Sequence, residues 1–178
     1  MLKLVPLLIL TTLPCHAFND DPDQYTGWNI ELLKYGTVTE AKLHDFDHEA
    51  KPLFGWGARI GYEFDGVSTI RVSAAKLDGS IDGSGFALHD TDYQADWVIG
   101  KTIDIFRGQL SFKPYGFAGW HWGKVKYNNQ VQKDSGFTYG LGLRFNVMRN
   151  LILGAEWNKT KVVSEKLDSV VLSVGFKF

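Results

Sequence analysis

The chain has 178 residues and a formal net charge of −1, which is enough for one domain and leaves no basic excess for nucleic-acid binding. Aromatic residues make up 14% of the chain and glycine occurs 19 times against 5 prolines, a composition that suits pleated strands better than helices. Beyond the start, no apolar run reaches the roughly 18 residues that a membrane-spanning helix needs. A helical membrane protein is therefore excluded.

Residues 1–17 have the pattern of a secretory signal peptide. Lys3 supplies the positive end, residues 4–13 are apolar, and the small residues around Ala17 suit a cleavage site. The apolar segment is too short to span a bilayer, so we expect cleavage, with residues 18–178 forming the mature domain. The sequence predicts export rather than an anchor.

Cys15 is the only cysteine, and it lies within the expected signal peptide. The mature chain would then hold neither a disulfide nor a thiolate metal site. The alternative, lipidation at Cys15, is disfavoured because Pro14 stands where such sites need a small residue.

Bulky apolar residues occupy every second position in several stretches of the mature chain, as in a strand that turns successive side chains to opposite faces. The clearest stretches are 54–64, 137–147 and 170–178. The full set of predicted strands is 25–35, 54–64, 67–77, 93–100, 110–123, 137–147, 151–158 and 170–178.

The connections between these predicted strands alternate between long and short. The long ones are 36–51, 78–90, 128–134 and 159–166, and the short ones include the Asp65-Gly66 hairpin turn and residues 148–150. An even number of strands with this rhythm is typical of outer-membrane barrels, with short periplasmic turns and long external loops. The sequence predicts an all-β fold, an eight-stranded antiparallel up-and-down transmembrane β-barrel whose amino end is periplasmic.

The alternating apolar residues of five predicted strands form faces without charges, whereas the opposite faces of the strands hold many. The five strands are 54–64, 67–77, 137–147, 151–158 and 170–178. An Arg or Lys facing lipid at mid-bilayer costs about 2–4 kcal/mol, so a charge-free face is expected to meet lipid. A hydrophobic protein core could not hold the charges of the other face, whereas a narrow barrel interior can if they pair. The candidates for ion pairs inside the lumen are Glu31, Arg59, Glu63, Arg71, Asp96, Arg144, Glu156 and Lys177.

Aromatic residues fall near both ends of the predicted strands, as expected of the girdles at the two membrane interfaces. The chain also stops on the alternating aromatics Phe176 and Phe178. The girdle candidates are Trp28, Trp56, Tyr62, Phe64, Tyr93, Phe137, Tyr139, Phe145 and Trp157.

The fifth predicted strand breaks the pattern. Tyr115 and Phe117 share one face, whereas Trp120 and Trp122 have the opposite parity. Either a bulge near Gly119 shifts the register, or the two tryptophans lie at or above the rim of the barrel. The sequence does not decide between these two readings.

The chain resembles the small outer-membrane β-barrel superfamily, which includes outer-membrane proteins A and X and the opacity-protein-like porins. The resemblance rests on the signal peptide, the glycine–aromatic strands at 114–119 and 139–143, and the terminal Gly175-Phe176-Lys177-Phe178. It implies recognition of Phe178 by the barrel-assembly machinery. It also implies a role in adhesion, colonisation or membrane stabilisation through the external loops.

Some small barrels modify lipid A, and histidine is central to that chemistry, so an outer-membrane enzyme is the alternative function. His121 lacks a serine two residues on, because Gly123 stands there. His89, Asp90 and Ser84 could form a second arrangement, but they lie in a glycine-rich predicted loop. We therefore expect no enzyme activity and no catalytic residue.

Two segments have weak metal-binding patterns. His44 and His48 are four residues apart among carboxylates, and the segment from Asp78 begins like a calcium loop but has His89 in place of the final glutamate. Both are better read as solvated loops, so no metal and no cofactor is expected.

Two further alternatives concern the barrel interior. A small channel is disfavoured because side chains fill a barrel of about eight strands, and balanced charges favour a closed lumen. A soluble ligand carrier would turn its apolar face inward and leave Arg59 and Arg144 outside, which the terminal Phe178 argues against. The expected partners are outer-membrane lipid and lipopolysaccharide, the barrel-assembly machinery and a host or surface ligand, with the protein itself a monomer.

Overall fold

The computed structural model describes residues 25–38, 54–80, 87–106, 109–127, 130–147, 150–161 and 166–178. The expected signal peptide lies outside these residues, as do His44, His48 and Ser84. The strands are β1 (Gly27–Val38), β2 (Phe54–Glu63), β3 (Ser68–Ser80), β4 (Ala87–Gly100), β5 (Ile103–Asp104), β6 (Leu110–Tyr127), β7 (Gln130–Val147), β8 (Leu151–Lys161) and β9 (Lys166–Lys177). Within these ranges, no helix combines the length and the apolarity needed to cross a bilayer.

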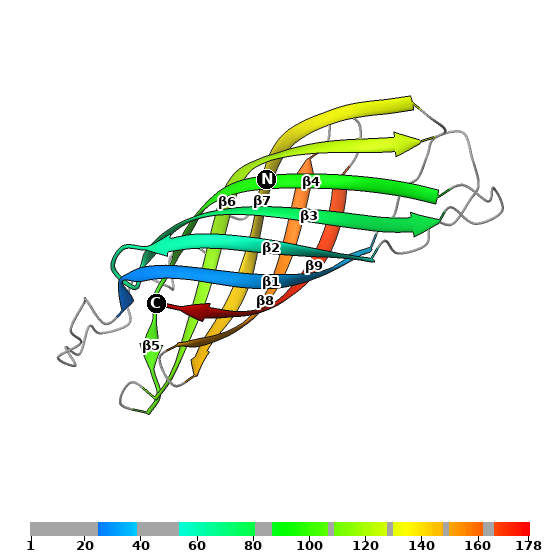
Figure 1. Cartoon of the computed structure of the whole chain (residues 1–178). Coiled ribbons are helices and arrows are strands. Elements are labelled where there is room, and N and C mark those ends of the chain that lie inside the picture. Colours follow the sequence, from blue (N-terminus) through cyan, green and yellow to red (C-terminus); the bar gives the residue numbers. More distant parts are fainter. Residues whose placement is uncertain are drawn as a thin grey trace, which may run out of the picture.

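Eight strands close into one antiparallel ring, which is plain in Figure 1. Consecutive strands pair from β1 to β4 and from β6 to β9, β4 pairs with β6, and β1 pairs with β9 to close the ring. The two-residue strand β5 pairs only with β6, so it extends the β4–β6 connection and is not a wall strand. The predicted eight-stranded up-and-down barrel is confirmed.

The two ends of the barrel differ, and we name them by their connections. The turn end holds the start of β1, the end of β9 and the turn at 64–67; the opposite end, where β1 ends and β2 begins, is the loop end. At the turn end the last residue joins the first strand, because Phe178 and Trp28 exchange backbone hydrogen bonds of 2.9 and 3.0 Å. The terminal aromatic residue therefore completes the ring.

Side chains alternate strictly between the two faces of the wall, with the polarity of a soluble protein reversed. Outward residues such as Leu32 and Leu172 are 62% and 56% exposed, while inward Arg59 and Arg71 are 2% and 1% exposed. A water-soluble barrel would hide the leucines and expose the arginines. An outer surface that is apolar between the two ends of the barrel instead matches lipid as the surrounding medium.

Strand β6 corrects the sequence-based reading of the fifth strand. Its pairing with β4 and β7 runs without interruption through Gly119, so the chain has no bulge there. Tyr115 and Phe117 point inward and are buried, whereas Trp120 and Trp122 point outward at the loop end. Large rings on the inward face made the strand look out of register.

Several strands continue beyond the predicted boundaries at the loop end. The predicted 128–134 connection shrinks to residues 128–129, because β7 begins at Gln130 and pairs with β6 up to Tyr127. No Gly or Pro interrupts residues 124–135, so the backbone ladder continues where polar side chains replace apolar ones. The predicted 78–90 connection likewise shrinks to 81–86, because β3 continues to Ser80, β4 begins at Ala87, and Asp78 pairs with His89 where a loop was expected.

Asp65 stabilises the turn between β2 and β3. Its carboxylate accepts hydrogen bonds from the backbone N–H groups of Ser68 at 2.8 Å and Val67 at 3.0 Å, and Gly66 adopts a positive φ of 71°. The bond from Ser68 and then that from Val67 lower the pKa of Asp65 below its usual range. The turn thus favours the ionised carboxylate.

We expect the stabilisation from Asp65 to depend on pH. Because its pKa is lower in the folded state, the contribution is complete above the unfolded value, near 4, and is lost as the pH falls through the folded value. The gap in thermal midpoint between the native chain and Asp65→Ala should therefore be largest at neutral pH and shrink toward pH 2. A gap that does not change with pH would assign the effect to the turn backbone.

Candidate functional site

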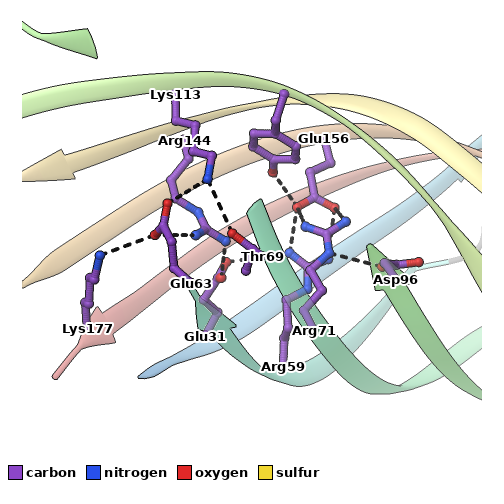
Figure 2. A network of polar contacts seen from close by, with 11 residues as sticks. Glu31, Arg59, Glu63, Thr69, Arg71, Asp96, Lys113, Arg144, Glu156 and Lys177 are labelled. Atoms are coloured by element: carbon purple, nitrogen blue, oxygen red, sulfur yellow. Dashed lines mark hydrogen bonds and ion pairs between the residues drawn. The ribbon is translucent and has the colours of Figure 1, made fainter. Parts of the chain in front are cut away.

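All eight charged side chains expected inside the barrel are buried in its interior. They are Glu31, Arg59, Glu63, Arg71, Asp96, Arg144, Glu156 and Lys177. The structure adds Lys113, which is 1% exposed on β6. Figure 2 shows that these residues come from many strands and meet in the lumen.

Glu156 is the centre of one half of this network. Its two carboxylate oxygens accept hydrogen bonds from Arg59 at 2.6 and 2.9 Å and from Arg71 at 2.6 and 3.2 Å. The Tyr115 hydroxyl donates a further bond of 2.6 Å. One buried carboxylate therefore binds two guanidinium groups and a phenol. Arg71 also donates a hydrogen bond of 3.0 Å through Nε to Asp96.

Glu63 is the centre of the other half, nearer the turn end. It accepts a hydrogen bond of 2.6 Å from Lys113 and one of 3.3 Å from Lys177. Lys177 also donates to the backbone oxygen of Tyr25, which lies just before β1. Ammonium groups from β6 and β9 thus converge on one carboxylate from β2.

Glu31 joins the two halves. It accepts a hydrogen bond of 2.9 Å from Arg144 and lies 3.6 Å from Arg59. Arg144 in turn lies 3.8 Å from the Glu63 carboxylate. Signs alternate along this chain of contacts, which is what allows charges to stay buried despite the cost of desolvation.

An apolar layer lies inside the barrel on the loop side of the network, and sequence reasoning missed it. It is built by the buried cluster Leu33, Tyr35, Ala75, Leu77 and Val171. A second buried cluster, Val98, Tyr115 and Phe117 on β4 and β6, packs within the network, where the Arg71 guanidinium lies 4.5 Å from the centroid of the Phe117 ring. These residues alternate with outward ones, so only their place on the inward face reveals them. The lumen therefore combines a charged layer with an apolar layer.

Lys113 was missed for the same reason as the β6 register. Lys113 shares the inward face of β6 with Tyr115 and Phe117. Because the sequence left the orientation of these two aromatic residues open, Lys113 was not assigned to the lumen. The inward face of β6 becomes clear only from its pairing with β4, in which Tyr115 lies opposite Gly100 and Gly116 lies opposite Ile99.

Gly142 on β7 makes room for Tyr115. A Cβ atom at Gly142 would lie 2.4 Å from Cζ and 2.6 Å from the hydroxyl of Tyr115, the group that binds Glu156. A Cβ at Gly116 would meet nothing closer than 3.7 Å. The two glycines therefore form a matched pair, one needed for space and one not.

We expect Gly142→Ala to destabilise the barrel and Gly116→Ala to leave it nearly unchanged. The displaced Tyr115 ring would lose its bond to Glu156, which costs about 1–3 kcal/mol for a buried polar group left unsatisfied. Urea unfolding of both variants in phospholipid vesicles measures the difference. Equal midpoints for the two variants would show that the Tyr115–Glu156 contact does not depend on this space.

His121 also lies inside the barrel. Its Nδ1 is 3.0 Å from the carboxylate of Asp92, and both residues point inward near the loop end. The described residues include no group of three histidine, cysteine or acidic side chains that could hold a metal ion.

The girdle candidates lie on the outer face. Those at the turn end are Trp28, Tyr62, Phe64 and Phe145, and those toward the loop end are Trp56, Tyr93, Phe137, Tyr139 and Trp157. Tyr62 is half-buried because Trp28 and Phe64 each pack an edge against its ring at centroid distances of 5.1 Å. Phe176 and Phe178 are also exposed, at 59% and 72%.

Comparison with known proteins agrees with this architecture. The family model described as "Outer membrane protein beta-barrel domain" matches residues 5–178. The attachment invasion locus protein of Yersinia pseudotuberculosis is 25% identical over 133 residues, which is 70% of this chain and 71% of that protein.

Two solved structures show the same fold. The N-terminal β-barrel domain of Pseudomonas aeruginosa OprF aligns with a TM-score of 0.58 at 16% identity, covering 86% of this chain and 99% of that one. Ail of Yersinia pestis, solved in complex with the heparin analogue sucrose octasulfate, aligns with a TM-score of 0.50 at 18% identity, covering 86% and 97%. The chain belongs to the outer membrane protein β-barrel domain family, whose members lie in the outer membrane of Gram-negative cells.

Proposed function

We propose that this protein is a plugged outer-membrane scaffold that attaches the cell to a host or surface ligand through its external connections. The observation that carries the proposal is the filled lumen. A barrel whose interior is occupied by alternating buried charges and an apolar layer offers its function at the ends of the strands. The similarity to the attachment invasion locus protein supports attachment as that function.

The orientation follows from the two ends of the barrel. The turn end, with both chain termini and the short 64–67 turn, would face the periplasm, where Phe178 would be recognised during assembly. The loop end would face outward, with the connections at 39–53, 81–86, 128–129 and 162–165. Export by the signal peptide at residues 1–17 and a monomeric state complete the proposal.

Replacement of the connections tests attachment. Cells that display a variant with a short Gly-Ser linker in place of residues 40–51, and a second variant with residues 81–86 replaced, should bind host cells or matrix less than cells with the native chain. The wall strands stay intact in both variants, and surface display of each is checked with an epitope tag. If both variants bound host cells or matrix as strongly as the native chain, the proposal would be contradicted.

We further propose that the barrel does not modify lipid A. His121 is held by Asp92 inside the barrel and not on the lipid-facing wall where an acyl chain could reach it. Mass spectrometry of lipid A from cells with and without the gene tests this. A new acylation or deacylation product that depends on the gene would overturn the proposal.

We expect the native barrel to lack a stable open conductance, since the buried ion pairs and the cluster around Leu33 and Leu77 would together occlude the lumen. Replacing Leu33 and Leu77 with serine removes bulk from the apolar layer while leaving the ion pairs in place, and should increase the frequency of brief openings. Recordings in planar phosphatidylcholine bilayers measure this. A steady conductance of the native chain, unaltered by these replacements, would refute the closed lumen.

A further inference from the structure

Lysines are concentrated on the outer face of the wall near the loop end. The described outward residues there include Lys34, Lys76, Lys124, Lys133 and Lys159, against only two acidic residues, Asp78 and Asp168. Asp168 already forms an ion pair of 3.6 Å with Lys159. This part of the wall therefore presents a surplus of positive charge to whatever lies beside it.

Two of these lysines flank one tryptophan. Trp56 on β2 is paired directly with Lys34 on β1 and with Lys76 on β3, so the three side chains stand in one row across three adjacent strands. Directly paired residues hold their Cβ atoms about 5 Å apart, which brings both ammonium groups within reach of one anion. We call this row the Lys34–Trp56–Lys76 triplet.

The triplet is pre-organised on one side and accessible on the other. The Lys34 ammonium lies 4.2 Å from the centroid of the Trp56 ring and 6.0 Å from that of Phe54, which holds it against the wall. Lys76 is exposed. Within the described part of the chain, the ion pairs found involve neither of these two lysines.

The outer face of the wall directly next to the triplet is apolar, and two of its three side chains are short. The next row toward the turn end consists of Leu32, Ala58 and Ala74, which are paired in the same way and face outward. The methyl groups of two paired alanines let an acyl chain approach the sheet closely. A ligand that touches both rows must therefore combine an anionic head with a hydrocarbon tail.

We propose that the Lys34–Trp56–Lys76 triplet binds the phosphate of an anionic lipid in the outer leaflet, with an acyl chain lying over Leu32, Ala58 and Ala74. A soluble sulfated glycan fits less well, because the lysines project sideways from the wall beside an apolar row. The Trp56 ring sits at the level where an interfacial tryptophan contacts lipid headgroups. This site is separate from the external connections, so it stands whether or not those connections mediate attachment.

Lipid binding by the refolded mature chain tests this proposal. Native mass spectrometry in a neutral detergent titrates the chain with bisphosphorylated lipid A, and with the same lipid after removal of its phosphates. The double variant Lys34→Gln/Lys76→Gln is compared with Lys101→Gln, which removes an exposed lysine at the turn end. Far-UV circular dichroism and resistance to SDS at room temperature establish that all variants are folded.

We expect the double variant to bind bisphosphorylated lipid A about tenfold to thirtyfold more weakly, since each lysine near an anionic surface contributes on the order of a fivefold effect. Lys101→Gln should bind like the native chain, and the dephosphorylated lipid should not distinguish the variants. Unchanged binding by the double variant, or an equal loss in Lys101→Gln, would overturn the proposal. Loss of binding to a heparin fragment with lipid A binding retained would overturn it in favour of a glycan site.

Discussion

Replacing Glu156 with glutamine should lower the free energy of unfolding by about 3–5 kcal/mol, the cost of removing one partner from a buried ion pair. The carboxylate accepts bonds from Arg59, Arg71 and Tyr115, and glutamine keeps the shape but not the charge. Two guanidinium groups would then face each other without their shared counter-charge. Urea unfolding in phospholipid vesicles, followed by tryptophan fluorescence, measures the change.

The matched control for Glu156→Gln is Asp168→Asn. This variant also removes a carboxylate that pairs with a cation. The Asp168 carboxylate, however, lies 3.6 Å from Lys159 in a partly exposed pair on the outer face. Exposed pairs contribute about 0–1 kcal/mol, so this variant should unfold almost like the native chain. Similar losses in both variants would show that the lumen network does not stabilise the barrel.

A second variant separates lost charge balance from lost packing. Adding Arg71→Gln to Glu156→Gln removes one of the two cations that had shared the Glu156 carboxylate, so the double variant should be more stable than the sum of the single changes predicts. Strict additivity would mean that Arg71 and Glu156 act independently, which contradicts their hydrogen bonds of 2.6 and 3.2 Å.

Val72→Arg should lower the free energy of unfolding by about 2–4 kcal/mol, the cost of a positive charge facing lipid near the bilayer midplane. Val72 is outward and 50% exposed on β3, between Ile60 and Ala95 of the neighbouring strands. In water the same change at an exposed position would stay within about 0.5 kcal/mol. The measurement is again urea unfolding in phospholipid vesicles.

Ser135→Arg is the control for this change. Ser135 is also outward and exposed, but it is paired with Trp122 of the loop end and lies on the extension of β7. The cost of a charge falls to about 0–1 kcal/mol near the interface, so Ser135→Arg should unfold close to the native chain. If Val72→Arg were equally harmless, water and not lipid would surround the wall.

Alternation alone was sufficient to predict the fold of β2, β7 and β9. In each, large apolar residues stand at every second position, and small or charged residues stand between them. The surroundings of the apolar face followed from the charges on the opposite face, because Arg59, Glu63 and Arg144 could not share a dry core. Alternation with a period of two predicts the strands, and charges confined to one face predict that lipid surrounds the other face.

Two features of the fold could not be predicted from the alternation. Tyr115 and Phe117 are bulky and inward, so on β6 size no longer distinguishes the faces. The extension of β6 and β7 past the wall follows from continued backbone pairing, which polar sequences permit as readily as apolar ones. Local composition does not record where a strand leaves the membrane.

The partners within the lumen were also beyond the sequence. Glu156 lies on β8 and Arg59 on β2, two strands that are not neighbours, and their contact crosses the barrel. Which inward residues meet depends on the strand tilt and stagger of the closed ring. Alternation predicts that these residues face inward, but only the three-dimensional structure shows which pairs form.

Spin labels along β9 provide the most direct test of the claim that acyl chains surround the outer face. Residues 18–178 contain no cysteine, so Val170, Leu172, Val174 and Phe176 can each be replaced by a single labelled cysteine in a chain that begins after Ala17. All four residues are outward and at least 44% exposed. In vesicles, collision with oxygen should exceed collision with a water-soluble nickel chelate most strongly at Leu172 and Val174, and less toward Phe176. High nickel accessibility at all four positions would contradict the account.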